Sequence, residues 1–217
     1  VLSHKATVVL YPGNPQGRNP RELGPRGSSL VHVDSSGHCT AEFVPVDTVR
    51  WFWESVTIEQ LETDEALISA VERTCQRIRE NSAGRPAIGR ITVTGRGPLH
   101  RSLIQPAFAA ELLERLRERE GAEESFVWID RLVIDTRPPI DLEERRAGRD
   151  FVADFLNLVD DYRRDPARIE SLQQHLGRLF ESARVHRLLD SPTDDQLRQW
   201  LEAAELYCLD LLVPEEE

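Results

Sequence analysis

Short apolar runs separated by turn residues dominate the first sixty positions of the chain, and this pattern is typical of β-strands. We expect strands at three places in this region, residues 5–11, 28–34 and 39–46. Asp34-Ser35-Ser36-Gly37 lies between the last two and has the composition of a hairpin turn. The region is therefore predicted to be mainly β-structure.

An extended segment follows, and it carries three consecutive aromatic residues, Trp51, Phe52 and Trp53. Such a run raises the hypothesis of base stacking on a nucleic acid. In a strand, however, Trp51 and Trp53 share one face and Phe52 takes the other. We therefore expect these residues to pack between the sheet and a neighbouring domain.

Residues 61–135 alternate between helical and strand periodicity. Thr63 is placed as the N-cap of a helix. The apolar residues of that helix recur at helical spacing: Leu67, Val71, Cys75 and Ile78. A strand at 90–94, a helix with Pro106 in its first turn and a strand at 125–134 are expected next. The order α-β-α-β predicts a small layered domain in which two helices cover a sheet.

From Asp141 onward the apolar spacing is helical throughout, and three amphipathic helices are expected. Thr193-Asp194-Asp195-Gln196 has the pattern of a capping box that opens the last of them. Such helices form a small bundle or present an apolar face to a partner helix, and the pattern does not separate these alternatives. The whole chain is thus predicted to be of the α+β class, with three regions at residues 1–60, 61–138 and 139–217.

Composition fits a globular protein, with 40% hydrophobic and 30% charged residues among 217. No apolar run is long enough to span a bilayer, so we expect no membrane partner. The three cysteines, Cys39, Cys75 and Cys208, are scattered and favour reduced thiols in the cytoplasm over a disulfide framework or a zinc site. The net charge is −11, but residues 1–21 and 81–110 contain no acidic residue. Cationic patches can therefore exist on an anionic protein.

A long loop rich in proline, glycine and arginine joins the first two expected strands. Its residues in order are Tyr11-Pro12-Gly13-Asn14, Gln16-Gly17-Arg18, Arg21-Glu22 and Gly24-Pro25-Arg26-Gly27. A second segment lies downstream, Thr94-Gly95-Arg96-Gly97-Pro98-Leu99-His100-Arg101. In this order the two segments resemble the end of the catalytic domain and the capping domain of SbcD-like DNA-repair exonucleases, in the calcineurin-like metallophosphoesterase superfamily. The resemblance covers roughly residues 1–135.

The resemblance implies that residues 1–60 are the terminal strands of a phosphoesterase β-sandwich and that residues 61–138 form an α/β capping domain that orients DNA. It implies a loop structured by Tyr11, Pro12, Gly13, Asn14, Gln16 and Glu22. It also suggests five candidate contacts to the DNA backbone: Arg18, Arg21, Arg96, His100 and Arg101. For the arginines and the loop glutamate, pairing within the protein is an equally good expectation.

The catalytic motifs of that family are not in this sequence. Its members hold two divalent metal ions, with manganese expected here, on motifs that precede the Tyr-Pro-Gly-Asn turn. Gly37-His38 lacks the second histidine of the last of those motifs. We therefore expect this chain to bind no metal and to be inactive alone, while a longer parent protein is a DNA exonuclease.

By the same resemblance the expected partners are DNA and an SbcC-type coiled-coil ATPase, which would contact the C-terminal helices. The formation of a homodimer is a further possibility that the sequence does not decide. The alternative is a non-catalytic module that binds DNA or protein. If residues 5–60 are the last strands of a larger sheet, an unpaired edge and apolar surface should be exposed there.

Overall fold

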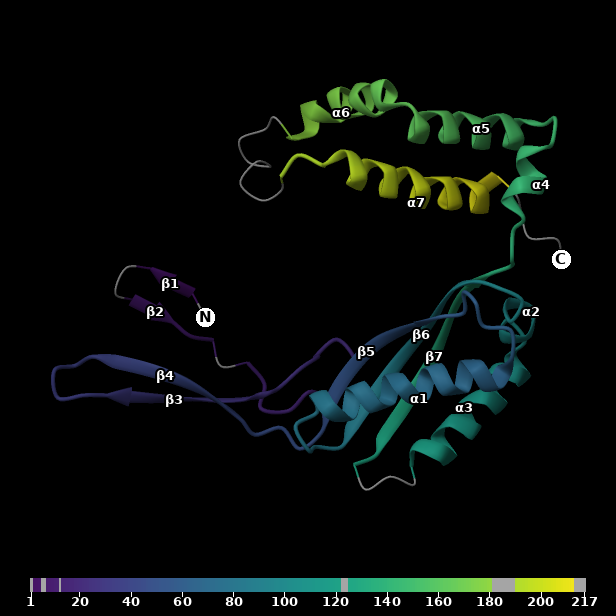
Figure 1. The fold of residues 1–217 in the computed structure, drawn as a ribbon. Helices are drawn as coiled ribbons and strands as arrows, with labels where there is room; N and C mark the ends of the chain where they lie inside the picture. Colours follow the sequence, from purple (N-terminus) through teal and green to yellow (C-terminus); the bar gives the residue numbers. More distant parts are fainter. Residues whose placement is uncertain (1, 5–6, 12, 122–124, 181–189, 213–217) are drawn as a thin grey trace. The chain divides into compact units, whose positions relative to one another are not determined.

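The fold was obtained as a computed structural model that describes residues 2–4, 7–11, 13–121, 125–180 and 190–212. The chain forms two compact units, residues 1–140 and 141–217 (Figure 1). This division lies two residues beyond the expected end of the second region.

The first unit begins with two separate antiparallel pairs of strands. β1 (Leu2–His4) pairs with β2 (Thr7–Val9), and β3 (Gly27–Val33) pairs with β4 (Cys39–Pro45). The strand expected at 5–11 is shorter in the structure, and β1 was not expected. Within the described residues these strands build no sandwich, so the phosphoesterase β-sandwich stays a prediction.

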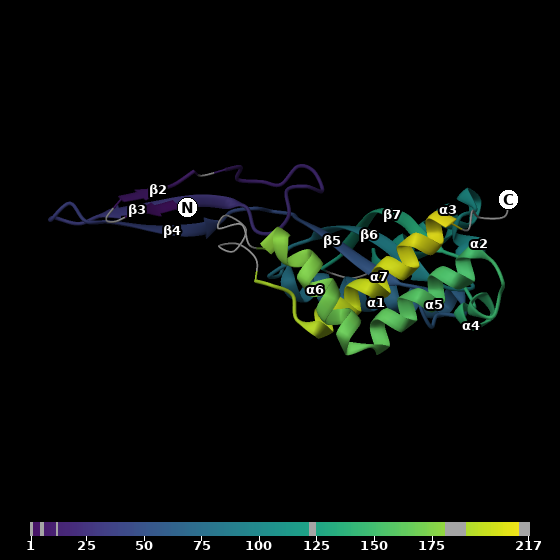
Figure 2. The same ribbon diagram turned by 90° about the horizontal axis from the view of Figure 1, so that it is seen from above.

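The predicted hairpin between β3 and β4 is confirmed, and its turn is held by one carboxylate. The Asp34 side chain accepts hydrogen bonds from the amides of Ser36 and His38, at 2.8 and 2.9 Å. These bonds hold the pKa of Asp34 below its ordinary value, the Ser36 hydroxyl contributing most. We call the two strands and their turn the ribbon; its strands run side by side in both views (Figure 2).

One face of the ribbon is apolar and exposed. Residues paired across an antiparallel ladder share a face, so the register places Val31 opposite Ala41 and Val33 opposite Cys39. Phe43, opposite Ser29, completes this face. Val31, Val33 and Phe43 are all exposed large hydrophobic side chains. The expected exposure of apolar surface in this region is confirmed.

A three-stranded parallel sheet forms the centre of the first unit. Its order is β5 (Arg50–Thr57), β6 (Ala87–Arg96) and β7 (Val127–Arg137). β5 therefore belongs to the same sheet as β6 and β7, whereas we expected residues up to 60 to belong with the preceding strands. The order of elements is β-α-β-α-α-β.

Within the described residues of the first unit, helices cover one face of this sheet. α1 (Asp64–Asn81) connects β5 to β6, while α2 (His100–Leu103) and α3 (Pro106–Glu120) connect β6 to β7. Crossovers between parallel strands are right-handed, and here both step in the same direction across the sheet. Both long helices therefore lie on the same face, as Figure 1 shows for α1 and α3. The expectation that two helices cover a sheet is confirmed.

Local sequence explains why these helices form where they do. The Thr63 hydroxyl accepts a hydrogen bond from the amide of Ala66, which confirms Thr63 as the N-cap of α1. Pro106 occupies the first turn of α3, as predicted. The expected stripe of α1 is fully buried against the sheet, and Leu112 and Leu116 bury the inner face of α3.

The second unit is helical. It consists of α4 (Leu142–Arg146), α5 (Phe151–Arg164), α6 (Pro166–Phe180) and α7 (Asp194–Leu212). α5, α6 and α7 all contact one another. Their buried apolar residues include Leu156, Ile169, Leu197 and Leu209. The three long helices therefore form a bundle.

The capping box that opens α7 is also confirmed. The Thr193 amide donates to the Gln196 side chain at 2.8 Å, and the Gln196 amide donates back to the Thr193 hydroxyl at 3.3 Å. Val185, expected at the end of the second helix, lies outside the described residues. Among the helices that the structure describes, none has the length and apolar character to cross a bilayer.

Candidate functional site

Two side chains organise the loop between β2 and β3. Gln16 donates to the carbonyl of Val49 at 2.7 Å and accepts from the amide of Thr48 at 2.9 Å. Glu22 accepts from the side chain of Asn14 at 3.1 Å and from the amide of Arg18 at 2.7 Å. The Arg18 amide is the main cause of a lowered pKa at Glu22. Asn14, Gln16 and Glu22 thus structure the loop and tie it to the start of β5.

The remaining motif residues of the loop contribute less. Gly13 has a φ of +69° with open space around a possible Cβ, so its role is conformational. Tyr11 is 90% exposed, and its expected structuring role stays a prediction. Pro12 lies outside the described residues. Arg18 and Arg21 are exposed; the Arg18 amide, not its guanidinium, makes the bond to Glu22 that fixes the loop.

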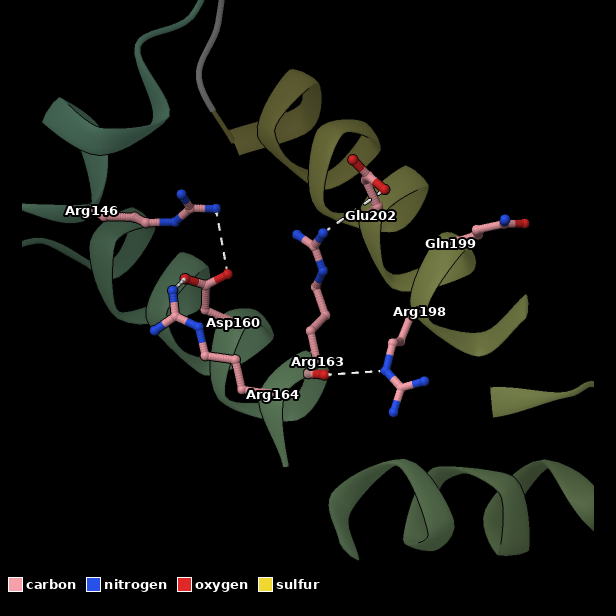
Figure 3. A pocket seen from close by; sticks show the side chains of 7 residues that line it. All are labelled: Arg146, Asp160, Arg163, Arg164, Arg198, Gln199 and Glu202. Atoms are coloured by element: carbon pink, nitrogen blue, oxygen red, sulfur yellow. Dashed lines mark hydrogen bonds and ion pairs between the residues drawn. The ribbon is translucent and has the colours of Figure 1, made fainter. Parts of the chain in front are cut away.

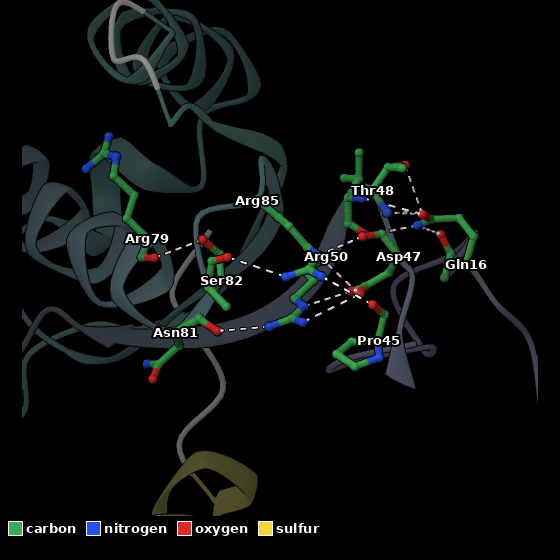
Figure 4. A network of polar contacts seen from close by, with 12 residues as sticks. Gln16, Pro45, Asp47, Thr48, Arg50, Arg79, Asn81, Ser82 and Arg85 are labelled. Atoms are coloured by element: carbon green, nitrogen blue, oxygen red, sulfur yellow. Dashed lines mark hydrogen bonds and ion pairs between the residues drawn. The ribbon is translucent and has the colours of Figure 1, made fainter. Parts of the chain in front are cut away.

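A buried ion network anchors the connection between β4 and β5, to which Gln16 of the loop is bonded, to the sheet (Figure 4). Arg50, the first residue of β5, donates from Nε to the Asp47 carboxylate at 2.7 Å, and both side chains are buried. Arg85 lies 3.3 Å from the same carboxylate and donates to the Asp47 carbonyl at 2.7 Å. Burial alone would raise the pKa of Asp47, but the Arg50 and Arg85 guanidinium groups lower it overall. Nothing in the sequence pattern had marked this network.

The second motif lies where the strands of the sheet end. Gly95 has a φ of +89°, and a Cβ there would come within 2.3 Å of the Thr57 hydroxyl. A Cβ at Gly97 would lie 3.0 Å from the carbonyl of Ile58. The glycines are therefore required by the close approach of β6 to the end of β5.

His100 and Arg96 are both bonded within this end of the sheet. His100 is only 6% exposed, and its Nδ1 lies 2.9 Å from the hydroxyl of Thr136 on β7. Its side chain is thus bonded inside the protein, and its expected contact with DNA stays a prediction. Arg96 donates to the carbonyl of Pro138 at 3.2 Å. Arg101 is exposed.

The two groups of candidate DNA contacts lie at opposite ends of the sheet. The loop bearing Arg18 and Arg21 is bonded to the start of β5, whereas Arg96 and Arg101 lie at the end of β6 and just beyond it. β6 has 10 residues, so about 30 Å separates the ends of the sheet at roughly 3.3 Å per residue. The carboxyl ends of parallel strands are the usual place for ligands in open α/β sheets. Arg96 and Arg101 are therefore better placed to bind a ligand than Arg18 and Arg21.

The described residues do not provide a metal centre. Among residues 2–4, 7–11, 13–121, 125–180 and 190–212, no three His, Cys, Asp or Glu side chains converge as metal ligands do. The donor groups present therefore do not fit a pair of divalent ions, and no step of phosphoester hydrolysis is assigned to them.

The second unit has an open depression of about 430 Å³ between α5 and α7 (Figure 3). It is lined by seven residues: Arg146, Asp160, Arg163, Arg164, Arg198, Gln199 and Glu202. Its arginines are paired, for example Arg164 with Asp160 at 2.9 Å and Arg146 with buried Glu205 at 2.8 Å. This arrangement is a charge network among α4, α5 and α7, and sequence reasoning had not identified it.

Comparison with known proteins finds similarity to metallophosphoesterases. Residues 51–137, from the second residue of β5 to the end of β7, match the family model described as metallophosphoesterase YhaO, middle domain. The matched segment is thus the parallel sheet with its helices, including β5. No solved structure matches the chain.

One curated relative extends this similarity. The chain is 35% identical over 136 residues to the "Uncharacterized metallophosphoesterase YhaO" of Bacillus subtilis (strain 168). The aligned part is 63% of this chain and 33% of the relative, so the chain spans about a third of the length of the protein it matches. Both matches support a metallophosphoesterase family; neither shows an SbcD-like DNA-repair exonuclease.

Proposed function

We propose that this chain is part of a metal-dependent phosphoesterase that acts on DNA as an SbcD-like repair exonuclease in the cytoplasm. The observation that carries the proposal is the match of residues 51–137 to the middle domain of a metallophosphoesterase. Two divalent ions, manganese by expectation, would be bound by a catalytic domain outside the described residues and would activate water against the phosphodiester. The role of this chain is to position the substrate and a partner.

The ribbon supports the presence of a further protein layer beside residues 27–45. A two-stranded ribbon is marginally stable alone, and this one exposes Val31, Val33 and Phe43 on one face. Terminal strands of a phosphoesterase sandwich would have this character, because the facing sheet of the sandwich would cover that face.

The role in substrate binding rests on the carboxyl end of the sheet. Arg101 is exposed, and no acidic residue occurs from Asn81 to Ala110. An exposed guanidinium group at this place suits a DNA phosphate, which it binds without reading the base sequence. Arg18 and Arg21, at the other end of the sheet, stay candidates for a separate contact.

Activity is tested on the longer gene product. We expect manganese-dependent degradation of linear duplex DNA, and a Gly-His-x-His motif in the coding sequence before Val1. A full-length product that binds manganese but degrades no DNA would contradict the exonuclease and favour the alternative of a non-catalytic interaction module.

DNA binding by this chain is tested separately. Replacing Arg96 and Arg101 by Ala should weaken duplex binding and flatten its dependence on salt concentration, because fewer counterions are released. Arg73→Ala is the matched control, since Arg73 is an exposed arginine on α1 of the same unit. An unchanged salt slope for the double variant would remove these residues from the proposal.

A partner of the SbcC type, a coiled-coil ATPase, is proposed for the second unit. α7 exposes Trp200, Tyr207 and Leu211 at helical spacing, although its other face is buried in the bundle. An exposed apolar stripe of this kind suits a partner helix. Replacing Tyr207 and Leu211 by Glu should abolish co-purification with the ATPase; retained binding would place the contact elsewhere.

A further inference from the structure

Among the described residues of the first unit, no helix covers the face of the parallel sheet opposite α1 and α3, and the composition of this face is unusual. Side chains alternate across a strand, so Ala87, Gly89, Ile91 and Val93 of β6 face the helices and are buried. The alternate positions, Ile88, Arg90, Thr92 and Thr94, face the other way. We call this second face the open face.

The open face does not have the composition of a surface meant for another helix layer. Parallel strands that are covered on both sides read as continuous apolar runs. Here β6 alternates between apolar residues and the polar series Arg90, Thr92 and Thr94. The alternation is that of a sheet with one face toward water or a polar ligand.

Two half-exposed tryptophans stand on this face. Trp53 lies opposite Arg90 in the register, and Trp128 lies opposite Ile88. Each is 46% exposed. They occupy the two outer strands, so roughly 10 Å of sheet lies between them at about 4.8 Å per strand.

Both rings are held in place by neighbouring residues. Trp53 Nε1 donates to the Thr92 hydroxyl at 2.9 Å, which lays the indole from β5 across β6. The Arg90 guanidinium lies 5.6 Å from its centroid and is itself held by Asp130. The Arg117 guanidinium lies 4.6 Å from the Trp128 ring and donates to the carbonyls of Ile129 and Asp130. These contacts therefore hold the indole rings of Trp53 and Trp128 in fixed orientations on the open face.

The charge of the open face favours an anionic ligand. Arg90 pairs with Asp130, and Arg137 lies 3.7 Å from Asp135. Arg131 is exposed beside the tryptophans and has no acidic partner among the described residues. A surface of oriented tryptophans, threonines and a surplus guanidinium matches the chemistry that binds unstacked bases and their phosphates.

We infer that the open face binds single-stranded nucleic acid, with bases stacked on Trp53 and Trp128 and a phosphate at Arg131. The inference rests on the proposed function for the nature of the substrate and specifies its form, an unpaired strand rather than a duplex. It also replaces the expectation that Trp53 packs between the sheet and a neighbouring domain. Trp51 packs beside the loop, since a Cβ on Gly17 would lie 3.2 Å from it, and Phe52 packs against the core.

The test measures binding, which needs neither metal nor hydrolysis. The 217-residue chain is titrated into fluorescein-labelled oligothymidylate and into a labelled duplex of equal length, with anisotropy as the readout. We expect tighter binding to the oligothymidylate. Trp53→Ala and Trp128→Ala should each weaken it roughly fivefold or more, as the loss of one stacked base does. Arg131→Ala should lower the salt slope by about one.

Trp200→Ala is the matched control, because Trp200 is 49% exposed but lies on α7. It should leave binding unchanged. Trp53→Phe and Trp128→Phe retain an aromatic ring and should keep most of the affinity, which separates stacking from a folding defect. Circular dichroism verifies that each variant is folded.

Several outcomes would overturn the inference. Native affinity for oligothymidylate in both folded alanine variants would exclude the tryptophans. Absence of single-strand binding, together with a change of mass in Trp53→Ala by light scattering, would make the open face a protein interface. Duplex binding that depends on Arg101 but not on Trp53 would refute only this inference. If neither DNA binds, the proposed DNA role of this chain fails too.

Discussion

The buried pair of Asp47 and Arg50 gives the most demanding test of how the connection between β4 and β5 is joined to the sheet. The Asp47→Ala substitution would leave the Arg50 guanidinium buried, with a 3.5 Å contact to the Asn81 carbonyl as its remaining bond. Removing one partner of a buried ion pair costs about 3–5 kcal/mol, because a charge is left without compensation. We expect Asp47→Ala to lower the free energy of unfolding of the first unit by that amount.

The assay must report on the first unit alone. The chain has four tryptophans, and Trp200 is the one in the second unit. In a Trp200→Phe background, fluorescence during urea unfolding at pH 7 therefore follows Trp51, Trp53 and Trp128. Arg115→Ala is the control, because its pair with Glu65 is exposed and is worth at most about 1 kcal/mol.

A double variant completes this test. If the two charges act as a unit, Asp47→Ala and Arg50→Ala together should cost less than the sum of the single changes. Since the pKa of Asp47 is lowered in the fold, its contribution is present above the ordinary value of 3.8 and is lost as the pH falls through the lower native value. Additive costs, or a loss below 1 kcal/mol for Asp47→Ala, would refute the reasoning.

Two further predictions concern single sites in the first unit. Gly95→Ala should lower the melting temperature more than Gly84→Ala, because both have positive φ but only Gly95 would also place a Cβ 2.3 Å from a neighbouring atom; equal losses would show that the contact relaxes freely. Burial raises the pKa of the Cys75 thiol to about 12. Ellman's reagent at pH 8 should therefore leave Cys75 unmodified in the folded Cys39→Ser variant. Rapid labelling of Cys75, identified by mass spectrometry, would contradict its buried position.

Elements whose signals are local could be predicted from the sequence. The N-cap at Thr63, the proline that begins α3 and the capping box at Thr193 act within one helical turn, so neighbouring residues were enough to place them. The hairpin turn at Asp34 is local in the same way. α2 was missed because it has only 4 residues and carries no capping side chain.

Features that depend on non-local pairing could not be predicted. β5 joins β6 in parallel across the whole of α1, and no residue of β5 indicates which strand it will pair with. For the same reason the sequence did not show that Arg21 and Arg96 lie at opposite ends of one sheet. Trp128 also gave no signal, because its importance comes from facing the same side as Trp53 two strands away.

The attachment of the ribbon has a consequence for how this chain can vary. The amides of Val46 and Asp47 both donate to the carbonyl of Arg26, at 3.0 and 3.1 Å. The segment that enters the ribbon and the segment that leaves it are therefore hydrogen-bonded to each other at a single carbonyl group, that of Arg26. Adding or removing two residues from each strand would change the reach of the ribbon, while the register at its base, the face on which each side chain lies and the network around Asp47 stay fixed. We therefore expect the ribbon to vary in length among related chains while the parallel sheet keeps the same structure.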